Sequence, residues 1–178
     1  MHQESMRGAL PARRGRGVTA LIASGSAMFV FGLAVSAAFA PEWRVLHVLQ
    51  ALIYVVLIAL ARRRSAWGFG AGLFVALFWN SLGIVATRAT LGGMNEVMSV
   101  VRTGHVQRPD LLLTLLATLG HVLIIIGCVI GIMRLQPKRR EWAQFLAGGV
   151  IGLGYLLAIV FAFGPPQAIE LMRHVFGG

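Results

Sequence analysis

The sequence predicts an all-α integral membrane protein: a bundle of five transmembrane helices with short amphipathic interfacial helices in an outer loop and at the C-terminus. Of the 178 residues, 57% are hydrophobic and only 12% are charged, and the mean hydropathy is +0.78. Soluble domains carry about a quarter of charged residues, so this chain cannot cover itself with a charged surface. Five apolar runs approach or exceed the ~20 residues that a helix needs to cross a bilayer. At this length we expect one domain.

Residues 1–17 are polar and basic, and we expect a flexible cytoplasmic tail. The first apolar run, residues 18–40, has a basic start and small residues at its end, a pattern that is also typical of a cleavable secretory signal peptide. We favour a retained span, because the run is long for a signal core and Pro41 hinders cleavage after Ala40. Cleavage of this segment as a signal peptide remains the alternative.

The second and third spans are residues 43–61 and 67–87, joined by a short basic turn. The outer loop, residues 88–110, follows the third span. Its apolar residues recur at the i, i+3, i+4 and i+7 spacing of an amphipathic helix, which we expect to lie on the membrane surface and to end at Gly104. These apolar residues are Met94, Val97, Met98 and Val101, and the other side carries Asn95, Glu96, Ser99 and Arg102.

The fourth span, residues 111–133, begins directly after Pro109 and Asp110. We expect the Asp110 carboxylate to accept hydrogen bonds from the free backbone N–H groups of the first helical turn. The fifth span, residues 142–164, ends at two prolines. The outer C-terminal segment, residues 165–178, is predicted to hold a short amphipathic helix from Gln167 to Phe176.

The basic residues predict the orientation. Eleven of the 16 Lys and Arg residues fall on one side if the N-terminus is cytoplasmic, and cytoplasmic segments are the ones enriched in basic residues. We therefore expect a multi-pass protein of the cell membrane, such as a bacterial inner membrane, with the N-terminus inside and the C-terminus outside. This bias also explains the net charge of +10, so we expect the lipid bilayer and no nucleic acid as a partner. The eleven residues are Arg7, Arg13, Arg14, Arg16, Arg62, Arg63, Arg64, Arg134, Lys138, Arg139 and Arg140.

Three spans carry polar residues at similar depth. With a rise of 1.5 Å per residue, four polar side chains fall in the outer half of the membrane. Polar groups at such depth face the bundle interior or a wet cavity, and they are candidates for a polar pocket or ligand-binding site. The alternative is hydrogen bonding between helices, and for His121 the roles of ligand, proton carrier and packing residue all remain open. The four residues are His47, Gln50, Asn80 and His121, and for the nearby Tyr54 we expect packing with a hydrogen-bonded hydroxyl.

Two glycine pairs predict close helix packing. Gly127 and Gly131 lie in the fourth span, and Gly148 and Gly152 lie in the fifth, each pair at the spacing that lets helix backbones approach. The single cysteine, Cys128, excludes an intramolecular disulfide, and we interpret it as a small apolar residue.

The sequence offers little support for catalysis. It contains no zinc-protease motif, P-loop or dinucleotide fingerprint, and no carboxylate within a span, so we expect neither an enzyme nor a metal site. Ligation of haem b by His47 and His121 is disfavoured, because their depths differ by roughly 6 to 9 Å. A quinone pocket that uses His121, Asn80 and Trp79 has no recognisable motif.

The expected function is therefore non-enzymatic. Small size, glycine-rich faces and amphipathic outer helices favour an accessory or structural subunit of a membrane complex, with membrane-protein partners or as a homo-oligomer. One alternative is a small-molecule carrier or binding protein with a polar pocket in the outer half of the membrane. Another is a redox subunit that binds haem or quinone.

Overall fold

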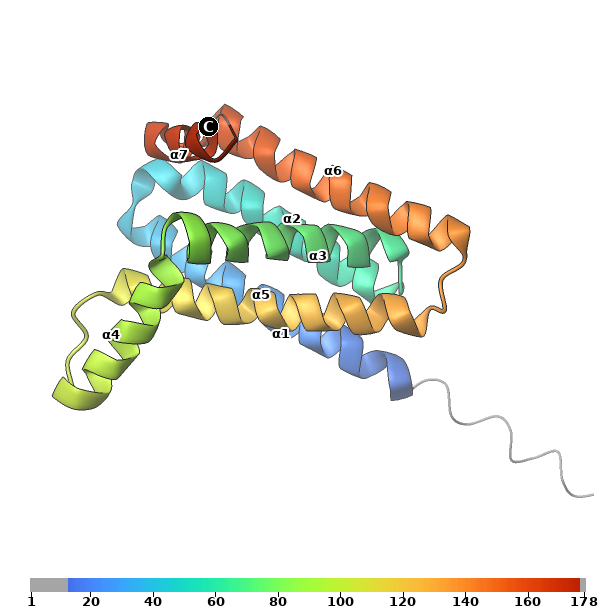
Figure 1. The fold of residues 1–178 in the computed structure, drawn as a ribbon, viewed down its shortest axis with the longest axis horizontal. Helices are drawn as coiled ribbons and strands as arrows, with labels where there is room; N and C mark the ends of the chain where they lie inside the picture. Colours follow the sequence, from blue (N-terminus) through green and yellow to red (C-terminus); the bar gives the residue numbers. More distant parts are fainter. Residues whose placement is uncertain (1–12, 177–178) are drawn as a thin grey trace, which may run out of the picture.

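The computed structural model describes residues 13–176, and this part of the chain contains helices and no strand (Figure 1). Five helices of the described chain are long and apolar enough to cross a membrane, the number of apolar helices that the sequence predicts. They are α1 (Arg13–Phe39), α2 (Arg44–Arg62), α3 (Ala66–Ser81, continued by a π-helical turn, η2, Leu82–Ala86), α5 (Pro109–Arg134) and α6 (Arg139–Phe163). The short helices are η1 (Pro41–Trp43), α4 (Ala89–Thr103) and α7 (Pro166–Phe176).

The helix boundaries differ from the predicted ones mainly at the start of the chain. Helix α1 begins at Arg13, before the predicted start at Val18, so the last part of the basic segment belongs to the first helix. Residues 1–12 of the predicted tail, and Gly177 and Gly178, lie outside the described residues.

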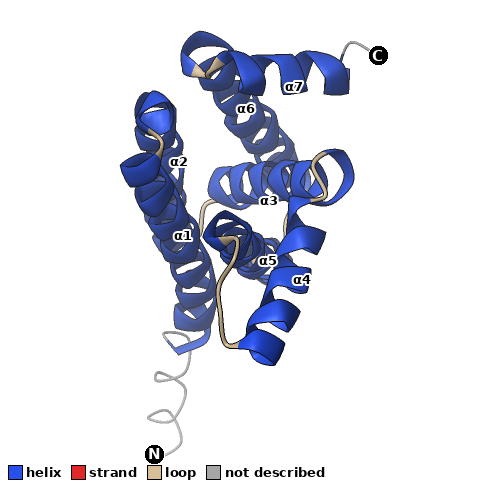
Figure 2. Cartoon of the chain, turned by 90° about the vertical axis from the view of Figure 1, so that its left-hand side faces the viewer, coloured by secondary structure: helices blue, strands red, loops and turns tan. Residues whose placement is uncertain are grey.

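Helix α3 lies in the middle of the bundle. It packs against α2, α5 and α6, and α5 in turn packs against α1 and α4 (Figure 2). We name the two ends of the bundle after residues in their connections. The Pro41 end holds the α1–α2 connection, the α4–α5 loop and α7, and the Arg63 end holds the α2–α3 and α5–α6 connections (Figure 1).

Glycines allow the long helices to approach closely. A Cβ atom at Gly127 would lie 2.7 Å from Cγ1 of Ile22 on α1, and one at Gly131 would lie 2.6 Å from the ring of Phe69 on α3. On α6, Gly148 packs against the backbone of Trp67, and a Cβ at Gly152 would meet that of Ala71 at 3.0 Å. The two glycine pairs therefore lie where α5 and α6 contact their neighbours, with little room for a larger side chain.

Helix α4 leaves the bundle at an angle and packs against the first turns of α5 (Figures 1 and 2). The chain turns at Arg88, which has a left-handed backbone conformation, and α4 ends at Gly104 with φ +72°, as predicted. Along α4 the apolar residues Met94 and Met98 are exposed, whereas Glu96 is buried. The helix thus turns its apolar stripe away from the bundle, and its buried residues are Thr90, Gly93 and Glu96.

Candidate ligand-binding pocket

A cavity of about 510 Å³ lies between α1 and α5 at the Pro41 end. Helix α1 supplies most of its wall, the start of α5 supplies the opposite side, and α2 contributes a single residue, His47. Ligand-binding pockets are commonly about 300–1,000 Å³ in volume and largely apolar with a few polar groups. The lining residues are Phe29, Gly32, Leu33, Val35, Ser36, Phe39, Ala40, His47, Pro109, Asp110, Leu113, Thr114 and Ala117.

His47 is the buried polar residue among those that line this cavity. Its side chain is 8% exposed, and its ring stacks on Trp43 with the two centroids 5.8 Å apart. The backbone carbonyl of Leu33 also faces the imidazole, yet Nδ1 is buried and forms no hydrogen bond within the described chain. Buried polar atoms almost always have a partner, so the unpaired nitrogen of this cavity-lining residue favours a partner from outside the described chain.

Gly32 gives the cavity its width. It is buried on α1, yet the nearest atom to a Cβ built there is the carbonyl oxygen of Leu113, at 3.8 Å. A buried glycine with ordinary space beside it differs from the packing glycines, whose Cβ positions are blocked. The absence of a side chain at Gly32 therefore contributes to the empty volume.

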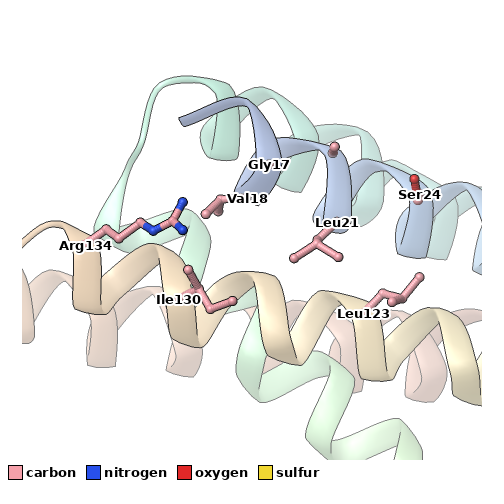
Figure 3. Close-up of a pocket in the computed structure, with 8 residues that line it drawn as sticks. Gly17, Val18, Leu21, Ser24, Leu123, Ile130 and Arg134 are labelled. Atoms are coloured by element: carbon pink, nitrogen blue, oxygen red, sulfur yellow. The ribbon is translucent and has the colours of Figure 1, made fainter. Parts of the chain in front are cut away.

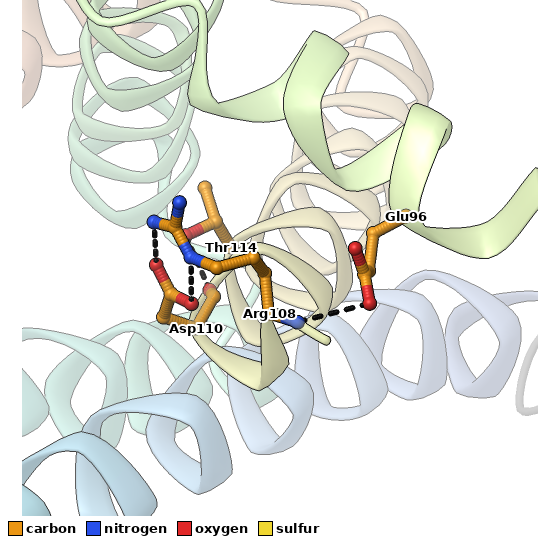
Figure 4. Close-up of polar contacts among 4 residues, drawn as sticks. All are labelled: Glu96, Arg108, Asp110 and Thr114. Atoms are coloured by element: carbon orange, nitrogen blue, oxygen red, sulfur yellow. Dashed lines mark hydrogen bonds and ion pairs between the residues drawn. The ribbon is translucent and has the colours of Figure 1, made fainter. Parts of the chain in front are cut away.

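Polar contacts surround the start of α5, where Asp110 and Thr114 line the cavity (Figure 4). The Asp110 carboxylate accepts hydrogen bonds of 3.0 and 2.7 Å from Nε and Nη2 of Arg108. The backbone N–H groups of Asp110 and Leu111 also contribute to stabilising this carboxylate, in line with its predicted role at the start of α5. The two-pronged, charge-assisted pair with Arg108 is the strongest of these contacts. The backbone N–H groups of Gln107 and Arg108 donate to the buried carboxylate of Glu96 on α4.

Arg108 and Asp110 form an ion pair at the start of α5. The hydrogen bonds that Arg108 donates to Asp110 raise the pKa of its guanidinium further above the ordinary value, so Arg108 stays positively charged at all physiological pH values. Because the Asp110 carboxylate balances this cation, the start of α5 carries one charge of each sign beside the cavity. Such a pair gives no electrostatic preference for an anionic over a cationic ligand.

His121 lies apart from the cavity in a separate polar contact. Its Nε2 is 2.7 Å from the hydroxyl of Tyr54, and both side chains are almost completely buried. The ring of Phe29 packs on both, with centroid distances of 4.3 Å to His121 and 4.6 Å to Tyr54. Since Phe29 also lines the cavity, this aromatic ring stands between the histidine–tyrosine pair and the cavity.

The structure therefore brings together fewer of the predicted site residues than the depth analysis suggested. Among the four, only His47 lines the cavity. Gln50 and Asn80 are buried on α2 and α3, and Oδ1 of Asn80 forms no hydrogen bond within the described chain. The hydroxyl of Tyr54 has the hydrogen bond that we expected for it, and its partner is His121.

The residue pattern of α1 did not predict its contribution to the cavity. Phe29, Gly32 and Ser36 line the cavity, but they lie in a span that showed no strong polar face. A signal was present at Gly32, a residue without a side chain between two bulky ones, Phe31 and Leu33. Only the relative position of α1 and α5 shows that this gap opens into a cavity.

Metal binding and haem ligation place separate requirements on the described residues 13–176. No three His, Cys, Asp or Glu residues gather there in a way that could hold an ion. For haem ligation, Nε2 of His121 would have to leave the Tyr54 hydroxyl. The cavity at His47 is thus the arrangement best suited to a ligand.

Comparisons with known protein families, with curated proteins and with solved structures find no match to this chain. The function must therefore be inferred from the site itself.

Proposed function

We propose that the protein binds a small amphiphilic molecule in the cavity between α1 and α5, with His47 as the residue that recognises its polar group. The observation that carries this proposal is a buried histidine, His47, that lines a cavity of about 510 Å³ and whose Nδ1 has no hydrogen-bond partner within the described chain. The histidine supplies one hydrogen-bond donor or acceptor, depending on the tautomer. The ligand would complete the hydrogen bond that the chain leaves unmade.

The surrounding residues narrow the chemical class. Phe29, Leu33 and Leu113 offer an apolar surface to most of the ligand, while Ser36 and Thr114 add hydroxyl groups. The compensated Arg108–Asp110 pair gives no reason for a net charge on the ligand. A neutral molecule with one carbonyl or hydroxyl group and an apolar body, such as a quinone, fits these features, and it would enter from the lipid.

Decylubiquinone is a suitable probe, because its carbonyl oxygens accept hydrogen bonds and quinones quench tryptophan fluorescence. Trp43 lies against His47 and serves as the internal reporter. We expect His47→Ala to lower the affinity measured in quenching titrations about tenfold, because the variant loses one hydrogen bond to a desolvated partner. Gly32→Leu should abolish binding by filling the cavity, and a competitor without a ring, 1-decanol, should displace the probe.

His105→Ala is the matched control, since His105 is exposed in the α4–α5 loop. Its affinity for decylubiquinone should equal that of the wild type, and Trp43→Phe should remove the quenching signal. Equal affinities of His47→Ala and the wild type would contradict the proposal. Failure of both decylubiquinone and 1-decanol to bind would reject a pocket for amphiphiles of this size.

An accessory subunit of a membrane complex stays a prediction beside this proposal. A subunit would extract from its native membrane in mild detergent as a large particle with fixed partners. For such a subunit, His47→Ala would change folding yield or assembly, and neither the wild type nor the variant would bind decylubiquinone.

We also propose that the Arg63 end is cytoplasmic and that the Pro41 end, with the cavity, faces outside. The support is the basic composition of the Arg63 end. In this orientation α4 and α7 would lie at the outer interface, and the exposed apolar stripe of α4 would contact lipid. Because Cys128 is the single cysteine, a Cys128→Ser background permits labelling of one introduced cysteine. An impermeant maleimide added to intact cells should label Thr103→Cys and not Ser65→Cys, and the reverse pattern would contradict the orientation.

A further inference from the structure

A second cavity lies between the same two helices, towards the Arg63 end (Figure 3). It has a volume of about 470 Å³, and its walls are apolar apart from Ser24 and the arginine at its end. Helix α1 contributes Gly17, Val18, Ala20, Leu21 and Ser24, and α5 contributes Leu123, Ile130 and Arg134. This groove is independent of the cavity at His47, with which it shares no lining residue.

The groove is open along α1. Gly17, Ala20 and Ser24 are exposed, so small residues form the rim through which a chain could enter from the side. Leu21 and Leu123 line it further along, where the two helices approach each other. The shape and chemistry suit an extended hydrocarbon chain that lies along the helices.

A guanidinium stands at the end of this groove. The side chain of Arg134 extends from the last turn of α5 towards the first turns of α1 (Figure 3). In a protein an arginine is always protonated, and its planar donors match a phosphate. The groove therefore combines an apolar trough with a fixed positive charge at one end.

The surroundings of Arg134 reinforce that charge. Among residues 16–176, the Arg63 end holds eight basic residues and one acidic residue, Glu141, whose carboxylate accepts the backbone N–H of Lys138. Basic pockets between transmembrane helices on the cytoplasmic side are typical binding sites for anionic lipid headgroups. The basic residues are Arg16, Arg62, Arg63, Arg64, Arg134, Lys138, Arg139 and Arg140.

We propose that this groove is a binding site for one anionic phospholipid, with an acyl chain between Val18, Leu21 and Ile130 and the headgroup phosphate on Arg134. The acyl chain gives affinity by burial, and the arginine gives preference for a net negative headgroup. The lipid fills the space between α1 and α5 and so ties the first helix to the bundle.

The test reconstitutes the full chain into vesicles of equal amounts of phosphatidylglycerol and phosphatidylcholine. The protein is then extracted in dilute detergent, and the lipids that remain bound are quantified by mass spectrometry. We expect phosphatidylglycerol to be enriched, and Arg134→Gln to lower this enrichment about fivefold, the typical contribution of one basic residue. Arg102→Gln is the matched control, with the same loss of charge at an exposed position of α4 at the Pro41 end, and it should retain the wild-type enrichment.

A second set of variants separates the two parts of the site. Ser24→Phe fills the groove and should remove both bound phosphatidylglycerol and bound phosphatidylcholine. Arg134→Lys keeps a positive charge and should retain part of the preference for phosphatidylglycerol, even if Arg134→Gln folds poorly. Inorganic phosphate should not displace the lipid, because it lacks the chain that the groove binds. Equal enrichment in the wild type and Ser24→Phe, an equal loss in Arg102→Gln, or displacement by inorganic phosphate would each overturn the proposal.

Discussion

Two cavities lie along one helix pair, and they differ in the polar group that each presents. Between them α1 and α5 are in direct contact, because Gly25 packs on the backbone of Gly120 and a Cβ at Gly120 would lie 2.6 Å from the carbonyl oxygen of Gly25. On one side of this contact is a buried histidine with an unpaired nitrogen, and on the other an exposed arginine at a helix end.

This difference shows that helix packing and recognition are set by different residues. The glycine contact fixes where α1 and α5 touch, and thereby where space remains on either side. The chemistry of each space then depends on one side chain, His47 or Arg134. A desolvated imidazole selects for a hydrogen-bonding group, whereas a permanent cation at a basic membrane face selects for an anion.

The largest effect should follow from breaking the contact that both cavities share. Gly120→Leu would drive a side chain into the backbone of Gly25, so α1 and α5 must separate. We expect a loss of at least about 2 kcal/mol in the free energy of unfolding, the scale of overpacking in a tight core. Titration of the purified protein from mild detergent into dodecyl sulfate, followed by circular dichroism, measures this loss.

Gly154→Leu is the matched control on α6, since a Cβ at Gly154 meets nothing within 4 Å. Its unfolding curve should overlay that of the wild type. If Gly120→Leu unfolds like the wild type and still binds decylubiquinone and phosphatidylglycerol normally, the close contact does not define the two cavities.

The sequence was informative where a local pattern decides the structure. The five apolar helices follow from composition and length, and the end of α4 at Gly104 follows from the preference of glycine for a left-handed backbone. The cavities could not be predicted from the sequence, because α1 and α5 are far apart in the chain and the position of their contact depends on which glycines meet. Gly25 and Gly120 carry no motif that would pair them.

The polar residues show the same limit. Residue spacing placed His47 and His121 in the outer half of the membrane, yet it could not show that Phe29 would stand between the cavity and the His121–Tyr54 pair. The start of α5 shows it as well. The position of Asp110 predicts its contact with the first backbone N–H groups, but the sequence did not show that Arg108 would pair with the same carboxylate or that Glu96 would reach the loop from another helix.

A smaller effect is expected at the Tyr54–His121 pair, which lies between helices, and it distinguishes this pair from His47, which lines the cavity. Tyr54→Phe removes the hydroxyl and leaves Nε2 of His121 buried without its partner. We expect a loss of about 1 kcal/mol in the free energy of unfolding, within the range for hydrogen bonds between helices in membranes. Decylubiquinone affinity should stay at the wild-type value, because Phe29 lies between this pair and the cavity.

Tyr155→Phe is the matched control, since its hydroxyl donates to the carbonyl of Leu49 over 3.2 Å from a side chain that is 39% exposed. It should lose less stability than Tyr54→Phe, because water or lipid headgroups can reach an exposed carbonyl more easily than a buried imidazole. The double variant Tyr54→Phe/His121→Leu should recover part of the loss by removing the unpaired nitrogen. A Tyr54→Phe protein of unchanged stability but tenfold weaker binding would place His121 in the ligand site, and the two histidines would then act together.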